Sequence, residues 1–346
     1  MKALVLHAPG QVRIDDVAKP VPGPTDVLVH VRACGVCGSD LAREAGAAHH
    51  FPIILGHEFA GEVTEVGSEV ERWAAGARVV AVPLLPCFAC ANCRAGLYAL
   101  CADYSFIGSR RDGGMAEFCI APERNLFPLP DKLGFAEGVL FEPATVTLHG
   151  LLMLPKPGRY RTVVVLGVGT IGAFGIQWAR SLGASKIIAA DIRDDALALA
   201  SAVGAATTIN SAKENVVEIV MRDTDGGADL VIETAGVPAS QTVAWELARP
   251  RGHVLQVGTA TRPVDFPPEV FEKLLRRELT VHGSWMSYSI PFPGREWTMT
   301  AEAFVSGRLI WEPVISHRLL LGESVQAFSL ARTSCGKVLI EMKNTE

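Results

Sequence analysis

The sequence predicts an α/β protein with a doubly wound, Rossmann-type parallel sheet beside a second, mostly antiparallel β domain. Before about residue 85, short runs alternate apolar and polar residues between Gly, Pro and Asp, a pattern typical of antiparallel strands. From about Arg161, strand-like runs alternate with helical stretches, which indicates the parallel sheet. The chain of 346 residues is long enough for two domains that each bury a core.

The antiparallel strands are predicted from the runs "DVLVHVRAC", "AGEVTEVG" and "ARVVAVP". The parallel strands are predicted from "RTVVVLG", "KIIAAD", "ATTIN", "DLVIETAG", "GHVLQVG" and "LTVHGSW". The stretch "PKPGRY", Pro155 to Tyr160, joins the antiparallel-strand pattern to the strand–helix pattern. After "SYSIPFPG" only a helix and the strand "GKVLIEM" remain, too little for a third domain. We therefore expect a first domain over 1–155, the parallel-sheet domain over 156–290, and a return to the first domain over 291–346.

Composition and charge narrow the classes of function. The net charge of −5 argues against nucleic acid and against an anionic membrane surface as partners. The N-terminal "MKALVLHAPG" is too short for the apolar region of a secretory signal. The longest uncharged stretch, Thr162 to Ile176, has 15 residues, fewer than the roughly 20 that span a bilayer. We expect a cytoplasmic protein whose thiols stay reduced.

Four of the eight cysteines lie together in "LPCFACANCRAGLYALC": Cys87, Cys90, Cys93 and Cys101. Zinc is held by four tetrahedral ligands, and short Cys-x-x-Cys steps bring thiolates to one ion at little loop-closure cost. The alternatives are buried free cysteines or two disulfides, but such short intervals make good disulfide geometry difficult. Since four thiolates leave no open position, the spacing predicts a structural zinc site.

The segment "VVVLGVGTIGAFGIQWARSLG" predicts a strand, a glycine-rich turn and a helix. Gly167 permits the tight turn, Gly169 lets the backbone approach a pyrophosphate, and Gly172 allows the helix to pack closely on the strand. The helix begins at Thr170 and Ile171, whose amides and positive dipole end favour an anion. The motif predicts a dinucleotide site, although such turns also serve only to pack a helix.

The strand "KIIAAD" ends in Asp191, 19 residues after Gly172. An acid at this place suits the ribose hydroxyls of NAD and repels the 2′-phosphate of NADP. Arg193 could instead be recruited by that phosphate, and Asp191 could merely cap the next helix. The pattern favours NAD.

Three further segments hold ligand-type residues: "CGVCGSD" has Cys34 and Cys37, "ILGHEFAG" has His57 and Glu58, and "LFEPATVTLHG" has Glu142. A catalytic zinc takes three protein ligands and keeps a position for water or substrate, which Cys37, His57 and a carboxylate would satisfy. The alternatives are a redox dithiol at Cys34 and Cys37 and a buried structural pair at His57 and Glu58.

These metal and glycine motifs, with "VPLLPCFACANCRAGLYALCADYSFIGSRRDGGMAEF" and "RRELTVHGSWMSYSIPFPGREW", resemble the zinc-dependent medium-chain alcohol dehydrogenase superfamily, in its polyol branch. The resemblance covers essentially the whole chain. It implies a GroES-like catalytic domain split around the nucleotide-binding domain, with the active site between them. It also implies two zinc ions per subunit, NAD, and a homodimer or homotetramer.

The resemblance implies catalytic roles residue by residue. It assigns the catalytic zinc to Cys37, His57 and Glu142, with Glu58 as a neighbouring carboxylate that exchanges into the shell, and leaves open which carboxylate binds at rest. Ser39 matches the hydroxyl that starts the family's proton relay. The chain departs from the ethanol-type pattern in having a carboxylate at Glu142 where those relatives have cysteine, and alanine at position 42 where their relay has histidine.

The expected reaction is hydride transfer between a secondary alcohol of a polyol or polyol phosphate and NAD, with galactitol 1-phosphate favoured. The alternatives are a sorbitol- or xylitol-type dehydrogenase, an L-threonine dehydrogenase, and a non-catalytic NAD-binding sensor. In "FIGSRRDGG", Arg110 and Arg111 form either a solvated turn or a clamp in which one guanidinium grips a substrate phosphate.

Overall fold

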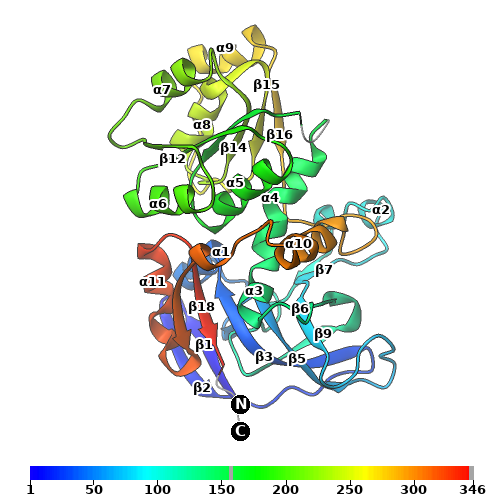
Figure 1. The fold of residues 1–346 in the computed structure, drawn as a ribbon. Helices are drawn as coiled ribbons and strands as arrows, with labels where there is room; N and C mark the ends of the chain where they lie inside the picture. The colour runs from blue at the N-terminus through cyan, green and yellow to red at the C-terminus, as the bar shows by residue number, and fades with distance from the viewer. Residues whose placement is uncertain (156–158, 343–346) are drawn as a thin grey trace. The chain divides into compact units, whose positions relative to one another are not determined.

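The computed structural model describes residues 1–155 and 159–342, so part of the expected joint at Pro155 to Tyr160 lies outside the described residues. The chain forms two compact units (Figure 1). Unit 1 comprises Met1–Glu142, Tyr288–Gly307 and Ile315–Glu346. Unit 2 comprises Pro143–Ser287 and Arg308–Val314. None of the described helices has the length and apolarity that a bilayer crossing requires.

Unit 1 is built on a mostly antiparallel sheet with the order β10-β6-β5-β3-β18-β17, to which β9 adds by pairing with β3. A three-stranded sheet β2-β1-β4 and the hairpin β7-β8 complete it. The strands are β1 (Lys2–Ala8), β2 (Gln11–Asp16), β3 (Asp26–Val36), β4 (Ile53–Ile54), β5 (Glu58–Val66), β6 (Arg78–Ala81), β7 (Leu84–Leu85), β8 (Ser105–Phe106), β9 (Phe118–Pro122), β10 (Leu126–Pro128), β17 (Ile315–Leu320) and β18 (Lys337–Glu341).

Short helices fill the connections of unit 1. They are α1 (Gly38–Ala42), α2 (Ala91–Arg94), α3 (Phe135–Val139), α10 (Arg295–Val305) and α11 (Ala327–Thr333), with the π-helical segment η1 (Arg43–Ala47) and the 3-10 segments η2 (Tyr98–Leu100), η3 (Glu123–Asn125) and η5 (Leu321–Gln326). The helix α4 (Phe141–Met153) begins in unit 1 and ends in unit 2. The unit's core is made by the inward residues of β1, β3, β5 and β18, among them Val29, Phe59 and Ile340.

Unit 2 holds a six-stranded parallel sheet with the order β13-β12-β11-β14-β15-β16. The strands are β11 (Thr162–Leu166), β12 (Lys186–Asp191), β13 (Thr207–Asn210), β14 (Ala228–Glu233), β15 (Ala248–Gln256) and β16 (Thr280–Gly283). The helices are α5 (Thr170–Ser181), α6 (Asp194–Ala202), α7 (Val216–Asp223), α8 (Pro238–Leu247) and α9 (Pro268–Arg276), with the turn η4 (Glu312–Val314). Strand order reverses between β11 and β14, which is where nucleotides bind in such sheets.

All six parallel strands lie at the predicted runs, and the inner strands β11, β12 and β14 are largely buried, whereas the edge strand β16 has no buried residue. Val163, Val164 and Val165 of β11 are at most 1% exposed. Helix α5 packs against β11 and β12, and α8 packs against β14 and β15.

Candidate active site

Strand register brings the predicted metal ligands of unit 1 to one end of the main sheet. In the β3–β5 pair, Gly35 lies opposite Glu58, so Cys37, His57 and Glu58 all lie where these strands begin or end. Among the described residues, the ligand atoms of Cys37, His57 and Glu58 lie within 4.8 Å of one another. Thiolate, imidazole and carboxylate in one small volume match the donor set of a catalytic zinc ion.

A buried carboxylate supports this group. Asp40 is fully buried in α1, and its Oδ2 accepts a hydrogen bond from the Cys37 backbone N–H at 3.0 Å. Its Oδ1 lies 3.5 Å from Nδ1 of His57 and accepts a hydrogen bond from Arg43 at 3.0 Å. Burial by itself raises the pKa of Asp40, but the charges of His57 and Arg43 outweigh it and hold that pKa below its usual value. A carboxylate facing the far nitrogen of a histidine orients its ring toward a metal.

The second buried ion pair joins Glu58 to Lys337, the first residue of β18. The Lys337 Nζ lies 2.7 Å from Oε1 and 2.5 Å from Oε2 of Glu58, and also donates to the Val36 carbonyl at 3.1 Å. Both side chains are at most 4% exposed. Burial would lower the pKa of Lys337, but the charges of Glu58 and Cys37 raise it above its usual value. The pair therefore fixes the Glu58 carboxylate beside the metal ligands.

Glu142 is not a member of the tight group, although it is buried nearby. It lies at the start of α4 and is 8% exposed. Burial raises the pKa of Glu142 to about 7; the charges of Glu58 and Asp40 add to this effect, and those of His57 and Lys337 oppose it. Glu142 is thus within electrostatic range of the group as a second carboxylate.

Ser39 is exposed on α1, two residues after Cys37. Its Oγ accepts a hydrogen bond from Arg43 Nη1 at 2.8 Å. The same Arg43 nitrogen reaches Asp40, so Ser39 is tied to the carboxylate behind His57. Because the Ser39 oxygen already accepts from Arg43, its own hydrogen is left to be donated elsewhere.

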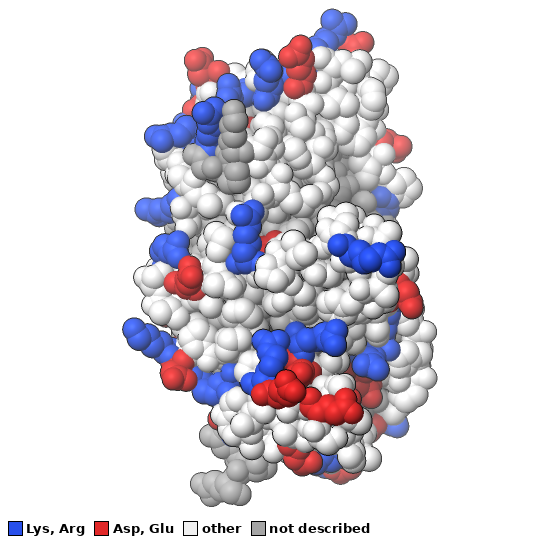
Figure 2. All heavy atoms as spheres, turned by 90° about the vertical axis from the view of Figure 1, so that its right-hand side faces the viewer, with Lys and Arg blue, Asp and Glu red and all other residues white. Residues whose placement is uncertain are grey.

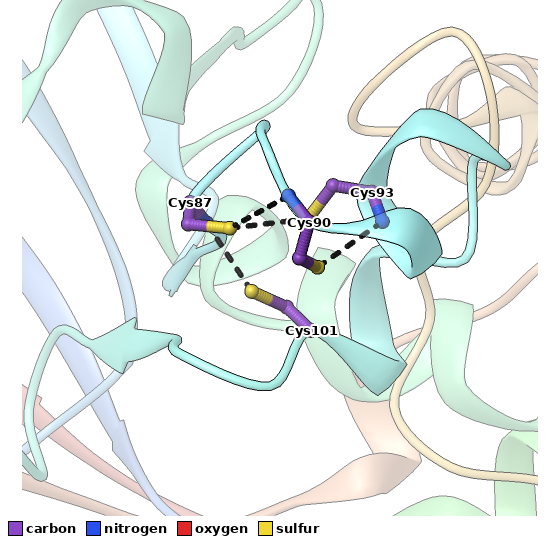
Figure 3. A group of neighbouring side chains, drawn as sticks. All are labelled: Cys87, Cys90, Cys93 and Cys101. Carbon is purple, nitrogen blue, oxygen red and sulfur yellow. Dashed lines mark hydrogen bonds between the residues drawn. The ribbon is translucent and has the colours of Figure 1, made fainter.

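The four cysteines of the loop point toward one another (Figure 3). Their sulfur atoms all lie within 4.8 Å of one another, and none of the eight cysteines is in a disulfide. Backbone N–H groups donate to the sulfurs: Cys90 to Cys87 at 3.3 Å, Cys93 to Cys90 at 3.4 Å, and Cys87 to Cys101 at 3.3 Å. This geometry matches a closed tetrahedral zinc site.

Backbone amides bias two of these thiols, Cys87 and Cys90, toward the charged form that zinc binds, by lowering their pKa. The amides of Cys93 and Ala102 lower the pKa of Cys90 to about 6. Burial raises the pKa of Cys93 to about 12, and hydrogen bonds shared with the neighbouring thiols add to this effect. A divalent cation would favour four thiolates together, because it removes the repulsion that keeps some of them protonated.

In unit 2 the predicted glycines form the turn between β11 and α5. Gly167 has φ of +83°, and a Cβ there would lie 2.7 Å from the Cβ of Ala235. A Cβ on Gly172 would collide with the carbonyl oxygen of Gly167. Gly169, the N-cap residue, faces open space, and Thr170 and Ile171 follow it as the first helical residues. The turn therefore leaves the N-terminus of α5 open, as a phosphate site requires.

Asp191 lies at the end of β12, and backbone amides hold its carboxylate. Oδ2 accepts from the Val168 N–H at 2.8 Å, and Oδ1 accepts from the Arg193 N–H at 3.0 Å. The side chain of Arg193 pairs with both oxygens of Asp195. The carboxylate is thus fixed beside the glycine turn, while the neighbouring guanidinium is bound to another acid.

The arginine pair of unit 1 is split between two surroundings. Arg110 donates to the Tyr104 carbonyl at 2.9 Å and lies over the ring of Tyr104. It is also near His49: burial lowers the pKa of His49, and the positive charges of Arg110 and Arg43 lower it further. Arg111 lines a separate cavity. On the face drawn in Figure 2, basic and acidic side chains are interspersed, so that face has no single broad basic patch.

Comparison with known families assigns the class. The description "Alcohol dehydrogenase GroES-like domain" matches residues 23–131, and "Zinc-binding dehydrogenase" matches residues 170–303. The chain belongs to the zinc-dependent medium-chain alcohol dehydrogenase family, and it is an enzyme of that class. The predicted fold class, a GroES-like domain with a Rossmann-type parallel sheet, is confirmed.

Individual members of the family show how similar the chain is to particular enzymes, by identity and by coverage. The chain is 41% identical to galactitol 1-phosphate 5-dehydrogenase of Escherichia coli (strain K12), over 98% of this chain and 99% of that one. The crystal structure of galactitol-1-phosphate dehydrogenase from Escherichia coli superposes with a TM-score of 0.91 at 40% identity, covering 99% and 100% of the two chains. The crystal structure of a zinc-binding dehydrogenase from Sinorhizobium meliloti 1021, bound to NADP, superposes with a TM-score of 0.89 at 34% identity, covering 98% of each chain. L-threonine 3-dehydrogenase of Rhizobium rhizogenes is 31% identical over 99% of this chain and 98% of that one.

Sequence reasoning missed three residues that support the site: Asp40, Arg43 and Lys337. Asp40 had a local signal, because an acid three residues after Cys37 is placed to bond back to the Cys37 amide as a helix begins. Lys337 had none, since it pairs with a residue 279 positions away.

Proposed function

We propose that this enzyme oxidises a secondary alcohol of a polyol phosphate, galactitol 1-phosphate, and transfers the hydride to NAD. The observation that supports this most directly is the identity of 41% to galactitol 1-phosphate 5-dehydrogenase across nearly the whole chain. The convergence of Cys37, His57 and Glu58 supplies a matching metal centre. The relatives that act on other alcohols make a free polyol or L-threonine the competing substrates.

Cys37, His57 and Glu142 would hold the catalytic zinc, with Glu58 as the exchanging carboxylate. Bound zinc supplies Lewis-acid polarisation of the substrate oxygen. Because Lys337 already neutralises Glu58, Glu142 is the carboxylate left to bind the ion at rest. Zinc analysis should find one ion fewer per subunit in Glu142→Gln than in Glu58→Gln. The reverse order would assign the resting ligand to Glu58.

Ser39 takes the proton from the substrate hydroxyl in this scheme. Arg43 fixes the Ser39 oxygen as an acceptor, and the substrate hydroxyl can donate to its second lone pair. The Ser39 hydrogen then passes onward. Position 42 is alanine, so the chain has no histidine there to receive that proton.

NAD would bind at the glycine turn of unit 2. The open N-terminus of α5 suits the pyrophosphate, and Asp191 suits the adenosine ribose. Ile192 and Val237 are 67% and 41% exposed, and these apolar side chains follow Asp191 and β14 respectively. Such residues offer apolar contacts to a flat base. When bound, NAD supplies the hydride acceptor.

Arg110 is our candidate for the substrate phosphate. It shares its surroundings with His49 and Arg43, and Arg43 bonds to Ser39. Because Arg43 is paired with Asp40, Arg110 is the guanidinium that we propose for the anion, and a planar guanidinium binds phosphate well. A charge-assisted contact is worth about 1.5–3 kcal/mol, so its loss should cost about tenfold to a hundredfold in kcat/KM.

The test is a screen of NAD reduction with galactitol 1-phosphate, galactitol, xylitol, sorbitol and L-threonine. Wild type should prefer the phosphate ester, and Arg110→Ala should lose that preference while Arg111→Ala serves as its matched neighbour. If wild type prefers an unphosphorylated substrate, the assignment moves to that substrate. If both variants keep the phosphate preference, the arginine clamp is wrong.

We also propose that the enzyme works as a homodimer or homotetramer in the cytoplasm. The cytoplasm suits eight cysteines that form no disulfide, because disulfides form in oxidising compartments. Light scattering of the zinc-loaded enzyme measures the assembly.

A further inference from the structure

We propose that unit 1 has a second anion site, a cavity between Arg111 and Arg124 that binds a small phosphate ester away from the catalytic metal ligands. The cavity has a volume of about 540 Å³, and its walls include Leu85, Phe88, Ser105, Arg111, Glu123 and Arg124. This volume is within the range of about 300–1,000 Å³ that small-molecule sites have. The proposal does not depend on which alcohol the enzyme oxidises.

Strand alternation places the cavity on the opposite face of the hairpin β7–β8 from His57. Leu84 pairs with Phe106, and Leu85 pairs with Ser105. Partners directly across a strand pair share a face, and successive residues alternate faces. Phe106 contacts His57 with ring centroids 5.5 Å apart, whereas Leu85 and Ser105 line the cavity. An anion in the cavity is therefore separated from the metal ligands by the hairpin.

Neither guanidinium group has a carboxylate partner within the described part of the chain. Among the residues that the structure describes, neither Arg111 nor Arg124 has an acid within ion-pair distance. Arg124 lies over the ring of Phe88, with its guanidinium carbon 4.9 Å from the ring centroid. Both arginine side chains are exposed, so water solvates them when the cavity is empty, and they give its lining two cationic donors that an anion could bind.

The acid in the wall is already engaged. Glu123 Oε2 accepts the backbone N–H groups of Glu71 at 3.1 Å and Arg72 at 3.0 Å. The lining thus has a net positive charge, and the hydroxyl of Ser105 offers a further donor.

The arginines project from segments that neighbouring strands hold in place. The Gly108 N–H donates to the Arg111 carbonyl at 2.8 Å, closing the turn after β8. Asn125, next to Arg124, donates to the Val82 and Leu84 carbonyls at 2.7 and 2.6 Å. A fixed backbone reduces the ordering cost of binding. The planar, forked donors of arginine favour phosphate over a simple halide.

The experiment is equilibrium dialysis of the zinc-loaded, full-length enzyme with radiolabelled inorganic phosphate, followed by displacement with glycerol 3-phosphate. We expect Arg111→Ala and Arg124→Ala each to weaken one saturable phosphate site about tenfold. Arg110→Ala should leave that site intact, and so should Arg13→Ala, which removes the same charge from an exposed position. Displacement by glycerol 3-phosphate at lower concentration than by unlabelled phosphate identifies an ester site.

The variants Arg111→Lys and Arg124→Lys control for misfolding, because lysine keeps the positive charge and removes only the planar guanidinium. Unchanged phosphate binding in both alanine variants would overturn the proposal. Loss of all phosphate binding in Arg110→Ala alone would also overturn it, by assigning the only phosphate to the substrate site. Absence of a phosphate preference in the substrate screen would contradict the proposed function and leave this second site standing.

Discussion

The two compact units position their functional side chains in opposite ways. In unit 2 the candidate nucleotide site is contained in one stretch from Gly167 to Asp191, and backbone groups do most of the positioning. In unit 1 the candidate metal centre draws on residues from Cys37 to Lys337, and buried charges do the positioning. A local motif tolerates change in its surroundings, whereas a set of buried charges fails when one member is removed. The predictions below test that contrast.

The largest effect is expected at the buried ion pair of unit 1. Lys337→Met should lower the free energy of unfolding by about 3–5 kcal/mol, because Glu58 would remain buried without a counter-charge. Urea denaturation of the zinc-loaded enzyme measures it. The double variant Glu58→Gln, Lys337→Met should recover most of the loss, since neither charge is then buried.

The matched control lies in unit 2, where Lys213 pairs with Asp194 at 2.8 Å. The Lys213 side chain is 63% exposed, so Lys213→Met should change stability by less than about 1 kcal/mol. Equal losses in the two lysine variants would remove the contrast between the units.

The next effect concerns the four-cysteine loop. Cys93→Ser should lose one of two zinc ions per subunit and melt on the order of 5 °C lower, because metal binding there is partly folding free energy. Elemental analysis and calorimetry measure the two changes. Cys335→Ser, outside both ligand groups, should keep both ions. One zinc ion or fewer in fully active wild type would refute the assignment of the loop.

A smaller effect is expected for cofactor choice in unit 2. Asp191→Ser should lower the ratio of kcat/KM with NAD to kcat/KM with NADP by about tenfold, because the carboxylate that disfavours the 2′-phosphate of NADP is lost. The fold should be retained, because the serine hydroxyl can still accept a hydrogen bond from one of the two backbone amides that Asp191 binds. Equal kcat/KM for both cofactors in wild type would mean that Asp191 does not select NAD.

The smallest effect is expected at a histidine pair on β15 and β16. His253 Nδ1 lies 3.0 Å from His282 Nε2, and the groups around His253 are Tyr160, Arg249 and Asp229. Burial lowers the pKa of both histidines, and the charges of His282 and Arg249 lower that of His253 further.

Because the pKa values of these two histidines are lower in the folded state, the unfolded chain binds more protons just below pH 6.5. The contribution of these two histidines to the free energy of unfolding is therefore fully present above about pH 6.5 and is lost as the pH falls below it. Urea denaturation at pH 5 and pH 8 should show a smaller difference in His282→Asn than in wild type. If the difference between pH 5 and pH 8 is the same in His282→Asn as in wild type, groups other than this histidine pair cause the loss of stability in acid.

The contrast also explains how far the sequence could be read. The fold class was predictable because apolar runs such as "TVVVL" become buried strands regardless of distant partners. The cysteine loop and the glycine turn are local in sequence, so spacing alone indicated which residues meet. Lys337 was not predictable, because the register of β3 with β18 decides that it lies beside Glu58. The tighter approach of Glu58 than Glu142 to Cys37 and His57 likewise follows from strand pairing, which no motif records.

The late position of β18 has a consequence for how the protein is made. Glu58 and Lys337 are separated by 279 residues, so at a synthesis rate of about 5–20 residues per second the glutamate waits roughly 15–55 s for its counter-charge. Until then β3 lacks its β18 neighbour, and its segment from Ala33 to Val36, beyond the part that pairs with β9, has an unpaired edge. Unit 2, emerging in between, has all six strands of its sheet before β18 is synthesised. The metal centre near the beginning of the chain is therefore among the last parts of the molecule to be completed on the ribosome.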